Sequence, residues 1–586
     1  MTGLREKFKL HGQRALKAIF NTTTLLYILL AAVLVIAAIA RIIGSQRGLP
    51  YLIVHDEPQT ANTALNMMLT GDYNPHFFSY GTLLIYINLL TDILHYFYLM
   101  AQPWNAVNFL RYLDQIQIGT EEYPWMVSHP TFYLWNRWVI SAMGTLSLVF
   151  VFQITRTIAN RWAGLVAAAL LGSVLFHVDH STMITNDVPV SLCMLAVIAL
   201  TMAYLRNAQP GYLISALIVC GAAASFKYNS VLIVIVPLWA LVDAMLSKSD
   251  GYRHWLWLAL ITIPPLAFLA GTPYAYWDLP TFLSGAGWEI FHYRVLGHGA
   301  FSIEPGIPHL QHQFNRVYIN LGFLNSTLSL ISLLGIIFLV TKRLGWLILS
   351  FGSVYALYMS SMIVSFHRNF LALYFILAIG FGCGIFILWR FIGRVISRMA
   401  PEKPHLRQFW LGIFAIMITM VMGYRLWLAV EYGQQVGNFW ETRTAAVQFV
   451  NQIFTERSID ADARIGIAEE LRVHTQDIRQ LTGEPTVEPQ QTLVCNIANY
   501  DFVIAGATFW AEATDTTMYD KAQLLNNHFP DEKNLSPIER LNSGGAVLLG
   551  SWPVSSPDIL IYSLSSEEKT RLAEATPLEG CRAETE

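Results

Sequence analysis

Long apolar segments separated by short polar turns occupy the first three quarters of the chain. The first segment, Thr24 to Ile43, is long enough to cross a bilayer as a helix. Further apolar segments cover residues 132–155, 162–178, 188–204, 211–226, 231–246, 255–271, 317–340, 346–364, 370–389 and 410–430. The pattern predicts a polytopic α-helical membrane domain over residues 1–430, with about eleven spans.

One apolar segment, Phe77 to Met100, is predicted not to cross. If it crossed, the basic turn Arg156 to Arg161 and every later basic turn would lie outside the cell, against the positive-inside rule. The segment is rich in Phe and Tyr, which suit a helix lying along the interface. We therefore expect a long first outer loop over residues 44–131 that contains such helices, and a second long outer loop over residues 273–315.

Basic residues set the expected orientation of the chain. Residues 1–23 contain five Lys or Arg residues and one acid, so the N-terminus is predicted to be cytoplasmic. The stretch from Arg390 to Arg407 is also strongly basic and is expected on the same side. The last span then leads outward, which places everything after it outside the membrane. We expect an integral membrane protein, of a prokaryotic plasma membrane.

The pattern changes after residue 430, where apolar runs become short. Thr442 to Phe454 has helical spacing of apolar residues, and four short apolar runs are typical of buried strands. These runs are residues 465–468, 500–505, 546–549 and 559–562. Residues 431–586 are therefore predicted to form a small extracytoplasmic α/β domain.

Composition agrees with a membrane protein and excludes some functions. The chain is 54% hydrophobic and 13% charged, with a mean hydropathy of +0.43, whereas a soluble domain has about 25% charged residues. A net charge of -3 carries no nucleic-acid signature. Cys495 and Cys581 lie in the C-terminal region, where a disulfide between them is left open because spacing alone proves nothing.

Acidic residues near the membrane are the first candidates for chemistry. Asp56 and Glu57 directly follow the first span, where charges are kept mainly if they have a role. An N-cap followed by Pro58 would explain one of these acids but not both. Asp187 begins a later span beside Pro189 and is either a helix cap or a site residue.

Cations and histidines are predicted on the same outer face. Lys227, Tyr228, His367 and Arg368 lie at outward span ends, where snorkelling or interfacial anchoring is the alternative role. Arg137 lies inside a span and needs an acidic partner, for which the first loop is the natural source.

The long outer loop is rich in histidine. Its histidines are His292, His298, His309 and His312. They lack a recognised ligand pattern, so no metal site is assigned, although a divalent metal is left open. Cations and acids gathered on one face suit an anion and a proton handled together, as at a phosphate-bearing lipid.

These stretches together resemble a known family. They are His55-Asp56-Glu57-Pro58, the run from Gly71 to Phe78, Trp135-Asn136-Arg137, the basic turn Arg156 to Arg161, Asp179 to Pro189, Phe226 to Asn229, and His367-Arg368-Asn369-Phe370. Their order, with a soluble domain at the end, resembles the GT-C superfamily of membrane glycosyltransferases. The similar branch contains the protein O-mannosyltransferases and the lipid A aminoarabinose transferases.

The resemblance implies a function and roles for residues. It implies a polyprenyl-phosphate-linked sugar as donor and inverting transfer to a hydroxyl of a protein, lipid or glycan on the extracytoplasmic face, without a required cofactor. Asp56 would act on the acceptor, Asp187 would help form the site, and Lys227 would contact the donor phosphate. His367 and Arg368 lie where related proteins place further site residues. Glu57, Arg137, Tyr228 and His298 complete the candidate set.

Departures from the family limit what is inherited, and other functions stay open. This chain has Pro58-Gln59 after the acidic pair and Ser79-Tyr80-Gly81 where aminoarabinose transferases carry a basic pattern, so sugar and acceptor are not transferred from them. A transporter or flippase of a lipid-linked glycan is the main alternative, but it would need polar residues through the midplane. A receptor would not need so many spans.

Overall fold

The computed structural model is largely helical. It describes residues 22–49, 52, 54, 56–101, 130–437, 442–457, 463–468, 485–488, 493, 496–506, 539–541, 559–563, 565–566 and 569–570. His55, Cys495, Cys581, the basic residues before position 22 and the predicted strand 546–549 lie outside the described residues.

The first half of the helical body runs from α2 to α12. Its helices are α2 (Thr22–Gly44), α3 (Glu57–Thr70), α4 (Leu83–Met100), α6 (Thr131–Ile158), α7 (Arg161–Ser173), α8 (Leu175–His180), α9 (Asp187–Asn207), α10 (Pro210–Phe226), the 3₁₀ helix η1 (Tyr228–Val234), α11 (Ile235–Leu246) and α12 (Trp255–Gly271).

The second half runs from α13 to α19. It comprises α13 (Tyr274–Trp277), α14 (Leu279–Phe291), the π-helical turn η2 (His292–Leu296), η3 (Gly299–Phe301), α15 (Ile307–Asn320), α16 (Asn325–Val340), α17 (Gly345–Ser360), η4 (His367–Phe370), α18 (Leu371–Met399) and α19 (Pro404–Gly437).

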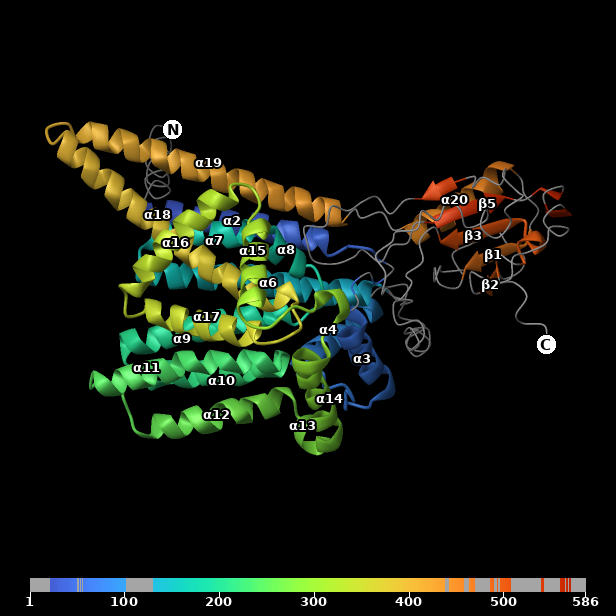
Figure 1. Cartoon of the computed structure of the whole chain (residues 1–586), viewed down its shortest axis with the longest axis horizontal. Helices are drawn as coiled ribbons and strands as arrows, with labels where there is room; N and C mark the ends of the chain where they lie inside the picture. The colour runs from blue at the N-terminus through green and yellow to red at the C-terminus, as the bar shows by residue number, and fades with distance from the viewer. Residues whose placement is uncertain are drawn as a thin grey trace, which may run out of the picture.

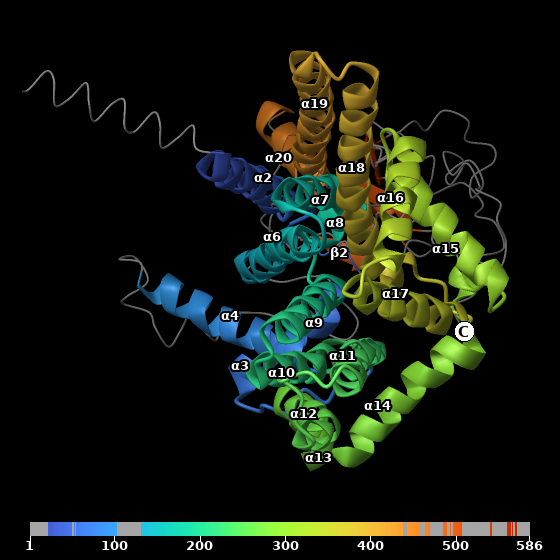
Figure 2. The same cartoon turned by 90° about the vertical axis from the view of Figure 1, so that its left-hand side faces the viewer.

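Most of these helices run along one axis, and a few cross it. Figure 1 shows α9, α10, α12 and α17 along the long axis of the molecule, and Figure 2 shows α9, α10 and α12 nearly end on. In Figure 2, α4 and α14 run across the view instead. Leu90, Leu94 and Phe97 on α4 are exposed, as expected of a helix that meets lipid. α4 is also long and apolar enough to cross a membrane, so its place along the interface stays a prediction.

The helices of the described residues account for the predicted spans. Seven are long and apolar enough to cross a membrane, and this set includes α4. Four shorter apolar helices, α7, α10, α12 and α17, coincide with predicted spans. The chain is therefore an integral membrane protein with a helical membrane domain, as predicted.

One predicted span is wrong in its extent. The segment 317–340 was expected as one helix, but α15 and α16 meet at a bend of 116°. Gly322 and Leu324 both have positive φ, 66° and 62°, which an α-helix cannot continue through. Only α16 follows the span direction, while α15 turns away and places His309 and Gln313 in the interior.

The basic turns gather at one end of the body. Arg161 at the start of α7 donates hydrogen bonds to Thr22 and Thr23 at the start of α2. Arg206 at the end of α9 reaches Thr157 near the end of α6, at 3.5 Å. This grouping agrees with the charge argument that placed all basic turns on one side.

Small residues allow two central helices to approach closely. A Cβ atom at Gly335 of α16 would lie 1.7 Å from the backbone oxygen of Gly380 in α18. Close backbone contact between small residues is a common way for helices to pack within lipid. The contact fixes the direction of α18, whose N-terminal end carries η4 and Arg368.

The described residues of the C-terminal region form a five-stranded mixed sheet. Its strands are β1 (Ile465–Ala468), β2 (Thr486–Glu488), β3 (Phe502–Gly506), β4 (Glu539–Leu541) and β5 (Ile559–Ser563), and its helix is α20 (Thr442–Arg457). The strand order is β2-β1-β3-β5-β4, with β1 parallel to β2 and β3, and β5 antiparallel to β3 and β4. Ile504 pairs with Ile561 in the centre of the sheet.

This sheet agrees with the predicted α/β character of the C-terminal region. The expected helix and three of the expected strands are found as α20, β1, β3 and β5. The short strands β2 and β4 were not predicted, because three residues carry too little pattern to detect. In Figure 1 the sheet lies beyond the same end of the body as α3, α4 and α14.

Replacement of Gly335 by alanine tests the close packing of α16 on α18. We expect the purified variant to unfold at a lower temperature, because overpacking costs about 1–3 kcal/mol and the neighbour here is backbone. The matched control is Gly423→Ala in α19, where nothing lies within 4 Å of an added Cβ. Equal melting temperatures for the two variants would contradict this packing.

Candidate active site

Asp56 precedes α3 but does not cap it. The residue occupies the N-cap position, yet its side chain makes no capping hydrogen bond. Instead, Asp56 Oδ2 lies 2.7 Å from Nη1 of Arg368, which belongs to η4 some 300 residues later in the chain. The helix-cap interpretation of Asp56 therefore fails, and its carboxylate belongs to a group of charges.

Arg368 contacts more than one neighbour in that group. Its Nε lies 4.0 Å from Oδ2 of Asp187, at the start of α9. Its guanidinium also lies over the ring of Phe366, 4.5 Å from the ring centroid, as in a cation–π contact. Arg368 is therefore held between two acids and an aromatic face.

Lys227 completes the group from the end of α10. Its backbone is extended, with φ -154° and ψ 124°, and this break between α10 and η1 directs the side chain inward. Lys227 Nζ lies 2.9 Å from Oδ1 of Asp187 and 2.5 Å from Oδ1 of Asn369. Asn369 in turn donates to the hydroxyl of Tyr293 at 3.2 Å.

We call Asp56, Asp187, Lys227 and Arg368 the charged cluster. Lys227, Arg368 and Asp187 are at most 8% exposed, so their charges have little access to water. Buried charges are tolerated when they pair with opposite charges and hydrogen-bond partners. The two carboxylates and two cations, which come from four distant segments, meet this condition because each charge has an opposite charge beside it.

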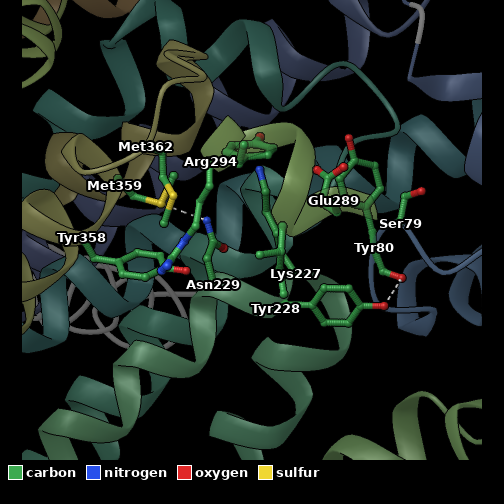
Figure 3. A pocket seen from close by; sticks show the side chains of 12 residues that line it. Ser79, Tyr80, Lys227, Tyr228, Asn229, Glu289, Arg294, Tyr358, Met359 and Met362 are labelled. Carbon is green, nitrogen blue, oxygen red and sulfur yellow. Dashed lines mark hydrogen bonds between the residues drawn. The ribbon is translucent and has the colours of Figure 1, made fainter. Parts of the chain in front are cut away.

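Two pockets adjoin the charged cluster. One is lined by Asp56, Thr185 and Asn186 together with Arg368, and the other lies between Tyr228, Glu289 and Met362. Tyr80 and Lys227 line both. Figure 3 shows Lys227 inside the second pocket, with Tyr80 and Glu289 on one side of it and Asn229, Tyr358 and Met359 on the other. The charged cluster is therefore approachable from two directions.

Glu57 and Arg137 form a separate buried pair. Arg137 donates from Nε and Nη2 to the two carboxylate oxygens of Glu57, both at 2.7 Å, and its Nη1 donates to the carbonyls of Ser45 and Arg47. Glu57 also accepts from the backbone N–H of Ile184 at 2.9 Å. Neither side chain is exposed.

The expected partnership of Arg137 with a first-loop acid is present, but the expected direct roles are not supported. A pair with no exposed atom has none to offer to a substrate. The structure thus places Arg137 and Glu57 in a buried pair away from the charged cluster, and their roles in substrate binding and catalysis stay predictions. The two residues join the start of α3 to α6 and to the segment before Asp187.

His367 is also turned away from the charged cluster. Its Nδ1 lies 2.7 Å from Oε1 of Gln313, and its Nε2 lies 2.7 Å from the hydroxyl of Tyr374. Both ring nitrogens are thus engaged between α15 and α18. The structure does not bring His367 to the charged cluster, which the neighbouring Arg368 contacts, and a role of His367 in substrate binding stays a prediction.

Tyr228 and His298 lie at the margins of the site. The hydroxyl of Tyr228 lies 2.8 Å from the carbonyl oxygens of both Phe78 and Tyr80, so it holds this loop while its ring lines a pocket. His298 is exposed, lies 3.0 Å from His292, and packs against Phe366 at a centroid distance of 4.8 Å. It reaches the charged cluster only through that ring.

Glu289 on α14 was missed by the sequence analysis. It lines the pocket beside Lys227, and burial raises its pKa to about 7, against the opposing effect of Lys227 and Arg368. The available signal was its position as the only charged residue of an otherwise apolar helix. Asn369 and Tyr80 were also missed as site residues, because their contacts come from distant parts of the chain.

The described residues offer no evident metal centre. No group of three or more His, Cys, Asp or Glu residues among them is arranged to hold a metal ion. The charged cluster itself offers carboxylates beside fixed cations. Such an arrangement can bind a phosphate and accept a proton within the same pocket.

Replacement of Arg137 by methionine tests the buried pair. We expect a loss of about 3–5 kcal/mol in unfolding free energy, because Glu57 is left buried without its partner, as judged by thermal unfolding of the purified protein. Glu57→Gln added to the same chain should recover part of this loss. Arg343→Met is the control, since Arg343 is 52% exposed in its pair with Asp243 and should cost about 1 kcal/mol or less. A similar small effect for both arginines would contradict the assignment.

Comparison with known proteins gives a family match over part of the chain. Residues 135–277 match the family described as dolichyl-phosphate-mannose-protein mannosyltransferase. This range contains Arg137, Asp187, Lys227 and Tyr228, and it excludes Asp56 and Arg368. No curated protein matches the chain in sequence.

Solved structures with a related arrangement are distant in sequence. The apo crystal structure of ArnT from Cupriavidus metallidurans has a TM-score of 0.48 at 11% identity, covering 93% of this chain and 99% of that one. ArnT bound to undecaprenyl phosphate has a TM-score of 0.46 at 12% identity, with the same coverage. The Archaeoglobus fulgidus oligosaccharyltransferase in its apo form has a TM-score of 0.47 at 11% identity, covering 83% of this chain and 70% of that one. The family match confirms the expected resemblance to protein mannosyltransferases over residues 135–277.

Proposed function

We propose that this protein transfers a sugar from a polyprenyl-phosphate-linked donor to an acceptor hydroxyl, with inversion at the anomeric carbon. The observation that carries the proposal is the contact of Asp56 with Arg368, beside Asp187 and Lys227. A potential base and two cations thus share one site between two pockets. The family match supports the same chemistry.

Lys227 and Arg368 are the proposed ligands of the donor phosphate. Guanidinium and ammonium groups both pair strongly with phosphate oxygens, and the planar guanidinium can bind two oxygens at once. In this structure both cations are paired with carboxylates. When the donor binds, the cations exchange a carboxylate partner for the phosphate. This exchange also releases Asp56 from Arg368.

Asp56, once released, is the proposed base. The hydroxyl oxygen of the acceptor attacks the anomeric carbon while the bond from that carbon to the phosphate oxygen breaks. The bonding electron pair leaves with the phosphate, and the hydroxyl proton passes to the carboxylate of Asp56. A positioned base contributes about 10²–10⁴-fold to such a step, and fixed cations stabilise the charge that develops on the leaving group.

Other residues position these groups. Asp187 and Asn369 fix the ammonium of Lys227 from two sides. Glu57, adjacent to Asp56 in sequence, anchors the start of α3 through Arg137. His298 supports the ring of Phe366, on which Arg368 lies.

The proposed site faces the extracytoplasmic side. It lies at the end of the body opposite to the basic turns, and basic turns favour the cytoplasm. The long lipid tail of the donor would extend into the membrane. The name of the matched family suggests mannose as the sugar and a protein hydroxyl as the acceptor. Lipid and glycan acceptors belong in the same transfer assay.

The transporter alternative has less support from the charge distribution. Arg137, Asp187 and Arg206 lie toward helix ends, and among the described spans Arg425 is a buried cation in the interior of α19. A transporter of a charged lipid-linked glycan needs polar groups near the midplane.

The direct experiment incubates the purified protein with a panel of polyprenyl-phosphate sugars and measures transfer or hydrolysis. Absence of both with every donor would overturn the proposed function.

Asp56→Asn is expected to lower the transfer rate by about 10²–10⁴-fold while leaving membrane insertion and folding intact, because asparagine keeps the shape but cannot accept the proton. Transfer is measured with purified protein and its active donor. Asp72→Asn is the control, since Asp72 is an exposed acid just after α3. Full activity of the Asp56 variant would remove it as the base.

Lys227→Ala is expected chiefly to weaken donor binding, because one of two phosphate ligands is lost. A charged hydrogen bond contributes about 1.5–3 kcal/mol, which corresponds to roughly 10–150-fold in Kd. Binding of donor to purified protein measures this. Lys342→Ala, at the basic end of the body, should leave the Kd unchanged. Unchanged donor affinity in the Lys227 variant would exclude it from the phosphate site.

A further inference from the structure

We propose that Glu289 contacts the sugar of the donor and accepts hydrogen bonds from its hydroxyl groups, so that it helps to select the sugar. The proposal rests on the proposed function and assigns a role to a residue outside the charged cluster. It is based on the placement of Glu289 by α14 and on the chemistry of the pocket that it lines.

The helix face of α14 directs Glu289 into the pocket. Phe282, Gly285 and Glu289 are spaced at i, i+3 and i+7, so they share one face of the helix. Phe282 packs edge-on against Phe78 and Tyr228, at centroid distances of 5.9 and 6.1 Å.

Gly285 allows this face to approach the loop closely. An added Cβ on Gly285 would lie 2.9 Å from the backbone of Phe78. This contact seats α14 on the loop that leads to Tyr80, one of the residues lining both pockets. Glu289, on the same face, is thereby carried to the pocket beside Lys227.

The rest of α14 makes the acid unusual. The helix has no fully buried residue, and Leu283, Trp288 and Ile290 are more than half exposed. Such a surface suits a helix lying in the membrane interface, which Figure 2 shows crossing the axis of the bundle. A carboxylate that is the single charge on an apolar interfacial helix is costly to place near lipid. Glu289 is half-buried because it faces the pocket.

The pocket offers groups that suit a sugar. Tyr80, Tyr228 and Tyr358 provide aromatic surface, and Asn229 provides an amide. The Oδ1 atom of Asn229 is buried and has no hydrogen-bond partner among the described residues. A ligand with several hydroxyl groups can donate to both this oxygen and the Glu289 carboxylate, which satisfies polar atoms that are otherwise costly to bury.

The charges separate the sugar from the phosphate within the pocket. A carboxylate repels a phosphate and therefore belongs beside another part of the donor, while Lys227 and Arg368 attract the phosphate. The groups facing Glu289 are Lys227 and Arg368, which lower its pKa, Asp56, which raises it, and His292, whose Nδ1 lies 3.6 Å away. Burial is the largest effect and raises the pKa of Glu289 to about 7.

This environment gives Glu289 a pH signature. Sugar hydroxyl groups that donate to Glu289 stabilise its ionised form, so the donor binds best while Glu289 is ionised. Donor affinity should therefore rise as the pH rises through about 7, the pKa of Glu289 in the free protein. Burial holds the pKa of His292 below its ordinary value.

The experiment compares two ligands in wild-type and Glu289→Gln protein. The first is the polyprenyl-phosphate sugar that the wild type binds most tightly among mannose, glucose, galactose and arabinose. The second is polyprenyl methyl phosphate, which carries the same single charge but no sugar. The matched control is Glu304→Gln, an exposed acid of the same outer segment.

We expect the Glu289 variant to bind the sugar-bearing donor about tenfold or more weakly, because a charged hydrogen bond is lost. Its affinity for polyprenyl methyl phosphate should be unchanged or higher, and its preference among the four sugars should shrink. Its donor affinity should also lose the rise between pH 6 and pH 8 expected in the wild type. Glu304→Gln should behave like the wild type in each measurement.

Three results overturn the inference. Equal weakening of both ligands would mean that Glu289 is structural, and unchanged binding of both would mean that it touches neither. A pH dependence that persists in the Glu289 variant would contradict its place beside the sugar of the donor. If the wild type binds none of these ligands, the proposed function itself fails, and this result is distinct from the other three.

Discussion

The ion pair of Asp56 with Arg368 is the contact on which the candidate site depends. It joins the entry to α3 with the entry to α18, two segments that meet only in the folded protein. Around it, Asp187 and Lys227 provide a second pair, so the buried charges balance. Balanced pairs can be held out of water, whereas any one of these groups left alone would be strongly destabilising.

Contacts within the helical body bring these helix ends together. Close contact of Gly335 with Gly380 fixes α18 against α16 and thereby places Arg368. The break after α10 places Lys227, and the Glu57–Arg137 pair secures the start of α3 next to Asp56. Crosswise helices α4 and α14 lie at the same end, as Figures 1 and 2 show, and α14 adds Glu289 to one pocket. The packed spans thus fix the positions of their ends, and the residues at and between these ends carry the charged groups of the candidate site.

Much of the fold was predictable from periodicity, and part of the site from charge. The lengths of the apolar segments predicted the helices, because apolar length can be read from a local stretch of sequence. The positions of the basic turns predicted that α4 does not run with the spans, and Figure 2 shows it running across them. Asp56, Asp187, Lys227 and Arg368 were predicted from their positions at outward helix ends together with the family resemblance, and the structure brings them together.

The failures have a common physical cause. Arg137 and His367 were grouped with the site because they are charged or titratable near the outer face. The structure does not bring them to the charged cluster, because the direction of each side chain is set by partners from distant segments, here Glu57 and the Gln313–Tyr374 pair. The bend between α15 and α16 depends on backbone angles at Gly322 and Leu324 that apolar spacing does not reveal. Glu289 was missed because its role arises from how α14 packs on the loop at Phe78.

The most direct test of the central claim is an experimentally determined structure with a non-reactive polyprenyl-phosphate sugar bound. The account predicts phosphate oxygens about 2.7–2.9 Å from the Lys227 ammonium and the Arg368 guanidinium, with the anomeric carbon facing the Asp56 carboxylate. It also predicts that the contact of Asp56 with Arg368 is released in that complex. A phosphate bound elsewhere, with the charged cluster still closed on itself, would contradict the account.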